Sequence, residues 1–299
     1  MNRRQKITAI ISGMATVLTV VVLFWVIVLH GNGQVLGVKI GAENNELEVD
    51  YLDVGQGDAI LIKAPGGQNI LIDGGPNSRV VERLSENLAP WDRKIDLMVL
   101  THPHDDHVSG LVNILDRFEV GKILYTGVSH DSPNYLAWLS KIKEKKLPIM
   151  IIDKAQTVDL GLGCRLEILY PLESFLNKEV ENLNNTSIVI KLVYNKESFL
   201  FTGDAEVEEE KKLLASGTGL ASDVLKAGHH GSDTSSGQEF LDKVAPDTAV
   251  ILVGKDNNFG HPSRRTMNRM EREKINYLRT DELGTIKIIS DGNKIEVRR

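Results

Sequence analysis

The sequence predicts an α/β (α+β) fold, an αββα sandwich of two mixed sheets with helices on their outer faces, preceded by a transmembrane helix. Three observations support this prediction. Short apolar or alternating runs, separated by turns rich in Gly, Asn and Asp, are typical of strands. Apolar residues spaced three and four apart between these runs indicate helices. The N-terminal residues 7–29 contain no charge, which is typical of a membrane span.

The uncharged N-terminal run has 23 residues. As a helix rising 1.5 Å per residue it would be about 34 Å long, enough to cross the hydrocarbon core of a bilayer. Arg3, Arg4 and Lys6 precede it, and a positive flank stays in the cytoplasm. We therefore expect a single-pass cell-membrane protein with its main domain outside the cell. Secretion after signal cleavage is the alternative, but the run is long for a signal core and no A-x-A-like site follows.

The domain organisation follows from this segment. Residues 1–30 are the predicted anchor, residues 31–46 a flexible tether rich in Gly and Asn, and residues 47–299 one folded domain. The single cysteine, Cys164, cannot form an internal disulfide and is interpreted as a small buried apolar group.

The charge balance bears on possible partners. The net charge is −6, and the first 30 residues carry +3, so the rest of the chain carries −9. A domain this acidic binds nucleic acid poorly by charge alone. Aromatic residues make up only 5% of the chain and give no indication of a base-stacking surface.

In the first half of the domain, three strand-like runs separated by turns predict an antiparallel meander, followed by alternating helices and strands. The expected strands are residues 47–54, 59–64, 69–73, 95–100 and 122–127, and the expected helices are residues 79–87, 108–118 and 133–146. In the last helix, Leu136, Leu139 and Ile142 are the expected buried face.

The second half continues the alternation. Residues 187–194 and 198–203 predict a hairpin with Asn195 and Lys196 at its turn. Further strands are expected at residues 223–228 and 248–253, and helices at residues 206–215, 237–244 and 264–274.

The run THPHDDHVSG, residues 101–110, is the strongest functional signal. It places His102, His104, Asp106 and His107 within six residues, and Pro103 disfavours a helix through it. Neutral imidazole and ionised carboxylate are preferred ligands of zinc and similar divalent ions. The run therefore predicts a metal site on a loop.

This His-x-His-x-Asp-His motif after an apolar strand resembles the signature of the metallo-β-lactamase superfamily. Further motifs of that superfamily follow in the expected order: LIDGG at residues 71–75, LFTGDAE at 200–206 and LKAGHHGSDTSS at 225–236. LDVGQGDAILI at 52–62, GHPS at 260–263 and RTDELGTIKIISDG at 279–292 resemble a narrower branch. That branch is the hydrolase domain of ComEC-type competence proteins, the DNA-uptake channel family.

The resemblance implies two divalent metal ions, Zn²⁺ or Mn²⁺, in an αββα sandwich. It implies that His102 and His104 bind the first ion, and that Asp106, His107 and one of the two late histidines bind the second. Asp204 would bridge the two ions, and Asp73 would support the site from behind.

The motif contains two adjacent histidines, His229 and His230, and only one of them can be the ligand, because adjacent side chains of an extended backbone point in opposite directions. We predict His229 as the ligand and His230 as a supporting group or proton donor. The resemblance also leads us to expect a histidine within residues 181–190, where the sequence has none. Asn184, and next Asn185, is the candidate replacement, and its amide would make the first site weak or selective for manganese.

Other residues are expected around the substrate. His261 is a predicted catalytic neighbour, the backbone N–H of Ser232 a phosphate contact, and Gln56 a turn residue or part of the site rim. Arginines at 264, 265 and 269 could meet phosphates, although an ordinary solvated helix face is the favoured interpretation.

The resemblance implies a hydrolase that cleaves phosphodiesters, with nucleic acid as the expected substrate and Asp106, His230 and His261 as catalytic residues. Two alternatives remain open. One is a phosphorylcholine esterase-like hydrolase of small phosphodiesters, which suits an acidic surface. The other is a non-catalytic surface binding module. A single span cannot itself form a DNA-uptake pore.

Overall fold

The computed structural model describes residues 34–35 and 45–298. The predicted transmembrane helix and most of the tether lie outside the described residues. Within the described part of the chain, no helix combines the length and apolar character needed to cross a membrane. Residues 45–298 belong to one compact unit, which is described by itself.

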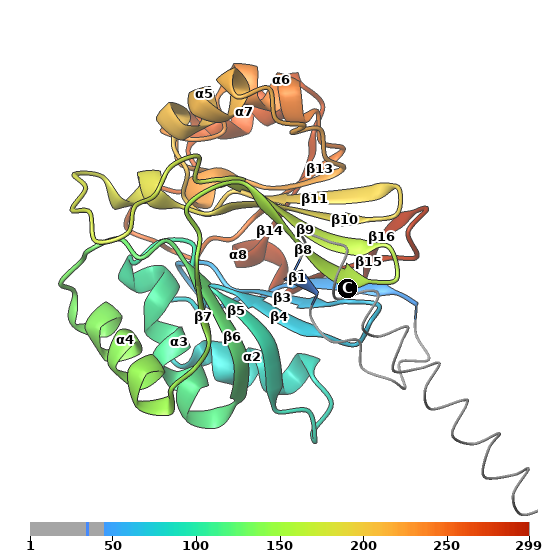
Figure 1. Ribbon diagram of the computed structural model, residues 1–299. Helices are drawn as coiled ribbons and strands as arrows, with labels where there is room; N and C mark the ends of the chain where they lie inside the picture. The colour runs from blue at the N-terminus through green and yellow to red at the C-terminus, as the bar shows by residue number, and fades with distance from the viewer. Residues whose placement is uncertain (1–33, 36–44, 299) are drawn as a thin grey trace, which may run out of the picture. The chain divides into compact units, whose positions relative to one another are not determined.

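The first sheet is mixed and has the strand order β16-β15-β2-β3-β4-β5-β6-β7 (Figure 1). The predicted meander is present, since β2, β3 and β4 pair antiparallel, while β5, β6 and β7 are added in parallel. The strands are β2 (Leu47–Tyr51), β3 (Ile60–Lys63), β4 (Asn69–Ile72), β5 (Lys94–Val99), β6 (Glu119–Tyr125), β7 (Ile149–Ile151), β15 (Ile286–Ser290) and β16 (Ile295–Arg298).

The second sheet contains the order β8-β9-β10-β11-β12-β13-β14, antiparallel up to β11 and parallel from there. The predicted hairpin is confirmed, because Tyr194 pairs with Glu197 and leaves Asn195 and Lys196 as a two-residue turn. The strands are β8 (Gln156–Gly161), β9 (Cys164–Tyr170), β10 (Val189–Tyr194), β11 (Glu197–Phe201), β12 (Val224–Lys226), β13 (Thr248–Ile251) and β14 (Asn276–Arg279). A further two-residue strand, β1 (Gln34–Val35), is also described.

Helices cover the outer faces of both sheets, so the predicted αββα sandwich is confirmed (Figure 1). One face carries α2 (Arg79–Asn87), α3 (Asp105–Arg117) and α4 (Pro133–Lys145), and the other carries α5 (Val207–Ala215), α6 (Gln238–Val244) and α7 (Arg264–Arg272). Short helices α8 (Thr280–Leu283), η1 (Leu183–Thr186) and η2 (Gly228–Gly231) lie in connections.

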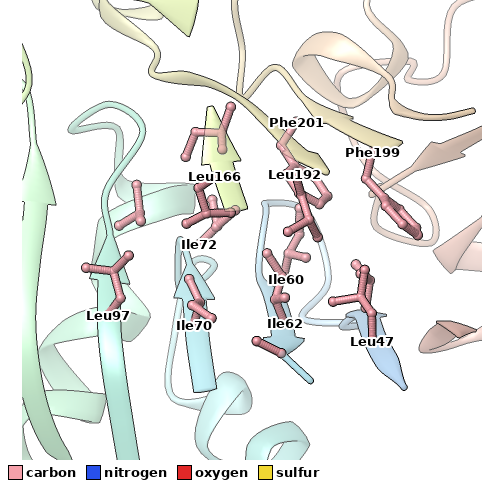
Figure 2. Close-up of a cluster of buried hydrophobic side chains, with 14 of the residues drawn as sticks. Leu47, Ile60, Ile62, Ile70, Ile72, Leu97, Leu166, Leu192, Phe199 and Phe201 are labelled. Atoms are coloured by element: carbon pink, nitrogen blue, oxygen red, sulfur yellow. The ribbon is translucent and has the colours of Figure 1, made fainter. Parts of the chain in front are cut away.

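The central core lies between the sheets. Ile60, Ile62, Ile70 and Ile72 of the first sheet face aliphatic and aromatic side chains of the second, including Phe201 (Figure 2). Alternate residues of each strand point toward the other sheet, and their side chains fill this core. Cys164 is buried in the same core, as the sequence predicted.

Two helices differ from expectation. Helix α3 begins at Asp105 rather than at residue 108, because Pro103 lies outside the helix and His104 is its N-cap. In α4 the buried face is Tyr135, Trp138 and Ile142, and Leu136 is exposed. The large rings take the inward positions because they bury more apolar area than leucine does.

Candidate metal centre

The sequence motifs meet where parallel strands end. Asp73 follows β4, and His102 follows β5 after a short turn, while Asp204 and His229 follow β11 and β12 in the other sheet. β4 and β5 are parallel, as are β11 and β12, so the two loops that follow each pair of strands lie at the same edge of their sheet. Because α3 starts at Asp105, Asp106 and His107 project from its first turn rather than from the predicted loop.

Four side chains form a compact ligand cluster: Asp106, His107, Asp204 and His230, with candidate ligand atoms all within 4.8 Å of one another. Asp204 Oδ2 lies 3.3 Å from His107 Nε2 and 3.4 Å from His230 Nε2, and His230 Nε2 lies 3.2 Å from Asp106 Oδ2. Tetrahedral bonds of 2.0–2.2 Å would place ligand atoms about 3.3 Å apart. The cluster therefore fits a single divalent ion.

Hydrogen bonds behind the cluster orient both imidazoles. His107 Nδ1 lies 2.8 Å from Asp73 Oδ2, and His230 Nδ1 lies 2.9 Å from the Leu252 carbonyl oxygen. Asp73 is itself held by the Thr101 backbone N–H and hydroxyl at 2.8 and 2.7 Å. Each Nδ1 has an acceptor behind it, so each Nε2 faces the cluster, the usual arrangement of histidine ligands. Asp73 thus lies where its predicted supporting role requires.

A second imidazole pair adjoins the first cluster. His102 Nε2 and His104 Nδ1 are 3.1 Å apart, and the His102 and His107 ring centroids are 4.1 Å apart. Burial lowers the pKa of both His102 and His104, which keeps these rings neutral with lone pairs available. The pair has the spacing of two ligands of one ion.

Asn184, the candidate third ligand of this second pair, lies in η1 and is buried. Its Nδ2 donates to Glu206 Oε1 at 3.1 Å, while its Oδ1 has no hydrogen-bond partner among the residues described. Asn185 Nδ2 donates to Glu208 of α5. An unpartnered buried carbonyl oxygen is a suitable ligand atom, but Asn185 Oδ1 is unpartnered as well, so this feature fits both amides and only the deeper burial of Asn184 separates them.

The geometry favours His230 over His229 as the candidate ligand, the opposite of the prediction. His230 is buried in the cluster, whereas His229 is partly exposed and its Nε2 lies 3.9 Å from Asp204 Oδ2. The sequence argument assumed an extended backbone, but both residues are left-handed, with φ of 48° and 53°. This costly conformation turns His230 inward and leaves His229 facing Asp204 from the open side.

Two charged residues of the site were missed. Lys226, fully buried at the end of β12, forms ion pairs with Asp58 and with Asp204 Oδ1, the latter at 3.4 Å. Asp58 Oδ1 also lies 3.2 Å from His230 Nδ1. A lysine inside the apolar run before HHGS, and an aspartate ending the VGQGD turn, were the available signals. Because Lys226 pairs with Oδ1 of Asp204, the other carboxylate oxygen, Oδ2, faces the cluster.

The remaining predicted residues lie around the centre rather than in it. The Ser232 backbone N–H, predicted to contact a phosphate, donates instead to the His229 carbonyl at 2.8 Å, and the Ser232 hydroxyl lies 3.1 Å from that of Thr234. Gln56 Oε1 accepts the Gly254 N–H at 3.1 Å, so both residues stabilise loops. His261 lies beside His229, with ring centroids 5.5 Å apart. Arg269 donates to the Ser235 and Ser236 carbonyls, whereas Arg264 and Arg265 are exposed.

Proton release should accompany metal binding. Burial lowers the pKa of His107 and His230, but the combined attraction of Asp204, Asp106 and the other neighbouring carboxylates outweighs it and raises both well above the usual value. A raised pKa favours the protonated form of both rings when no cation is bound, and a cation at Nε2 must displace that proton. We expect about two protons released per chain and an affinity that rises with pH. Calorimetry in two buffers of different ionisation enthalpy measures this number, and a buffer-independent enthalpy would contradict it.

This fold and this cluster define the class of metal-dependent hydrolases with a metallo-β-lactamase fold. The family model described as "Metallo-beta-lactamase superfamily" matches residues 52–255, more than half of the chain. The protein therefore belongs to the metallo-β-lactamase superfamily, as its motifs predicted.

Curated relatives confirm the narrower resemblance to competence proteins. "ComE operon protein 3" of Bacillus subtilis (strain 168) is 29% identical over 81% of this chain and 33% of that protein. "Competence protein ComA" of Neisseria gonorrhoeae is 31% identical over 81% of this chain and 32% of that protein. The chain spans about a third of the length of these relatives.

Solved structures agree on the fold. The metallo-β-lactamase fold protein YhfI from Bacillus subtilis has a TM-score of 0.52 with this chain at 10% sequence identity. The match covers 83% of this chain and all of YhfI.

Proposed function

We propose that the protein is a metal-dependent phosphodiesterase that hydrolyses nucleic acid, with DNA as the expected substrate. The observation that carries this proposal is the cluster of Asp106, His107, Asp204 and His230 beside the His102–His104 pair. The similarity to competence proteins supports the choice of DNA. Two adjacent cation sites suit phosphodiester chemistry, which needs both the attacking and the leaving oxygen stabilised.

Two divalent ions in these sites would activate a water molecule and stabilise negative charge on the phosphoryl oxygens. The chain's own residues set the geometry. Asp204 Oδ2 faces both His107 and His230, and Asp106 is the partly exposed member of the cluster, on the side open to water and substrate. His229, held by Thr234 and Glu206, lies at the open edge, where it can hold a proton near a leaving oxygen.

The metal preference follows from Asn184. An amide oxygen is a weaker zinc ligand than imidazole and suits manganese better. We propose that the site containing His102 and His104 has the lower affinity, and that Mn²⁺ supports activity at least as well as Zn²⁺.

One specific observation favours small phosphodiesters with a cationic headgroup as the second candidate substrate. A cavity of about 620 Å³ is lined by Tyr125, Tyr135, Asp131 and Glu179, and also by Leu183, the neighbour of Asn184. Aromatic rings and carboxylates together suit a quaternary ammonium group such as choline. This candidate keeps the same metal centre and changes only the substrate.

A substrate panel tests these proposals. Purified protein, loaded with Zn²⁺ or Mn²⁺, is assayed on single-stranded DNA, p-nitrophenyl phosphorylcholine and bis(p-nitrophenyl) phosphate. We expect DNA to be cleaved fastest, at least as well with Mn²⁺ as with Zn²⁺. A preference for the choline ester would favour the second candidate. A metal-loaded protein inert on all three would favour the non-catalytic binding module.

We also propose that the N-terminal residues 1–30 anchor the protein in the cell membrane with the catalytic domain outside. The motivation is the positive cluster before the 23-residue uncharged run. Protease added to intact cells should digest the domain. Protection until lysis would contradict this topology, and recovery of the domain from the medium would favour signal cleavage.

A further inference from the structure

We propose that Phe259 and His261 form an aromatic platform that stacks a base of single-stranded nucleic acid beside the metal centre. This inference rests on the proposed function and adds to it a means of selecting the substrate. It also revises the expectation from the low aromatic content, which pointed away from base stacking.

The platform is exposed at its outer end. The Phe259 side chain is 69% exposed, so its ring is accessible to a ligand. Its ring lies nearly parallel to that of His261, with an interplanar angle of 17° and centroids 6.0 Å apart. The two rings thus present similarly oriented aromatic faces.

The loop that carries the platform is held in place. Asn257 Oδ1 accepts the backbone N–H groups of Phe259 and His261, each at 3.1 Å, and Asn257 Nδ2 donates to the His261 carbonyl at 2.6 Å. The N–H of Ser263 donates to the Gly231 carbonyl at 2.9 Å, which ties the loop to the HHGS turn. An aromatic side chain on a pre-organised loop loses little entropy when it binds.

A chain of contacts links the platform to the ligand cluster. The His261 ring lies 5.5 Å from the His229 ring, edge to face, and His229 Nε2 lies 3.9 Å from Asp204 Oδ2. A base stacked on Phe259 would therefore extend this row of rings outward from the cluster.

Local charge points to nucleic acid as the occupant. The exposed Arg264 and Arg265 follow the platform in the first turn of α7, which contains no acidic residue. Although the domain is acidic overall and Arg265 Nη1 lies 3.5 Å from Asp233 Oδ2, that pair is exposed and therefore weak, so both cations are available to the phosphates on either side of a stacked base. Aromatic stacking combined with cations along the backbone is the usual mode of single-strand binding, and it depends little on sequence.

The test compares two oligomers of equal charge, oligo-dT and an abasic oligomer of tetrahydrofuran phosphates, with the full-length Mn²⁺-loaded protein. Phe259→Ala should lower kcat/KM on oligo-dT about tenfold more than on the abasic oligomer, mainly by raising KM. A tenfold effect corresponds to about 1.4 kcal/mol, which is within the range measured for stacking of one base on an aromatic side chain. Phe259→Trp should restore the preference for oligo-dT, and Phe259→Leu should not. Trp91→Ala is the matched control, because Trp91 is 85% exposed and precedes β5, at the end of that strand opposite the metal centre.

Equal losses on both oligomers, or full activity of Phe259→Leu on oligo-dT, would overturn the stacking role while leaving the phosphodiesterase proposal intact. A wild-type protein that cleaves neither oligomer, yet binds two metal ions, would overturn the phosphodiesterase proposal itself and the platform with it.

Discussion

Replacing Asp106 by Asn should lower the hydrolysis of DNA and of a generic phosphodiester at least a hundredfold. Asp106 Oδ2 faces His230 Nε2 at 3.2 Å on the open side of the cluster, so the substitution removes a charged ligand where water and substrate enter. A hundredfold loss corresponds to about 2.7 kcal/mol of transition-state stabilisation, within the several kcal/mol that metal-ion catalysis supplies. Initial rates at saturating Mn²⁺ measure the effect.

Asp105→Asn is the matched control, since it makes the same change in the same helical turn. Asp105 is exposed and its carboxylate contacts Ser132 at 3.3 Å, outside the cluster. It should retain activity within about twofold, as surface substitutions usually do. Equal losses in both variants would mean that the start of α3 tolerates no change, and would remove the argument for Asp106.

His230→Gln should lower the metal content from about two ions per chain to about one, and should abolish phosphodiester hydrolysis. His230 is buried, with Nδ1 against a backbone carbonyl and Nε2 against Asp106 and Asp204, so a glutamine cannot replace it as a ligand. His229→Gln should keep both ions and lower kcat, because His229 lies at the edge of the cluster. Elemental analysis after gel filtration measures the metal content.

The two neighbours serve as controls for each other. Loss of metal in His229→Gln with retention in His230→Gln would restore the assignment made from the sequence. Thermal unfolding with and without chelator gives an independent readout, because a cation bound only by the native state stabilises it. Chelation should lower the melting temperature of the wild type, and should lower that of the His230 variant less.

Much of this fold could be predicted from local pattern. The meander β2–β4, helix α2 and the hairpin at Asn195 and Lys196 lie where the sequence placed them, because periodicity and turn residues act over a few neighbours. The α4 face was predicted only in part: Ile142 is buried and Leu139 packs against the core as expected, but Leu136 is exposed. Tyr135 and Trp138, which also satisfy the helical spacing, take the other inward positions. Packing against β6 and α3 determined which of these side chains are buried.

The candidate site divides in the same way. The sequence by itself determined the ligand types, because His102, His104, Asp106 and His107 lie in one short run and the other motifs follow in register. The tertiary structure decided which atoms meet. Asp73 contacts His107 at a sequence separation of 34 residues, and His230 contacts Asp106 at a separation of 124. Buried Lys226 forms an ion pair with one carboxylate oxygen of Asp204. The types of the candidate ligands can be predicted from short stretches of sequence. The selection of His230 over His229 depends on the left-handed backbone of both residues and on partners that only folding brings together.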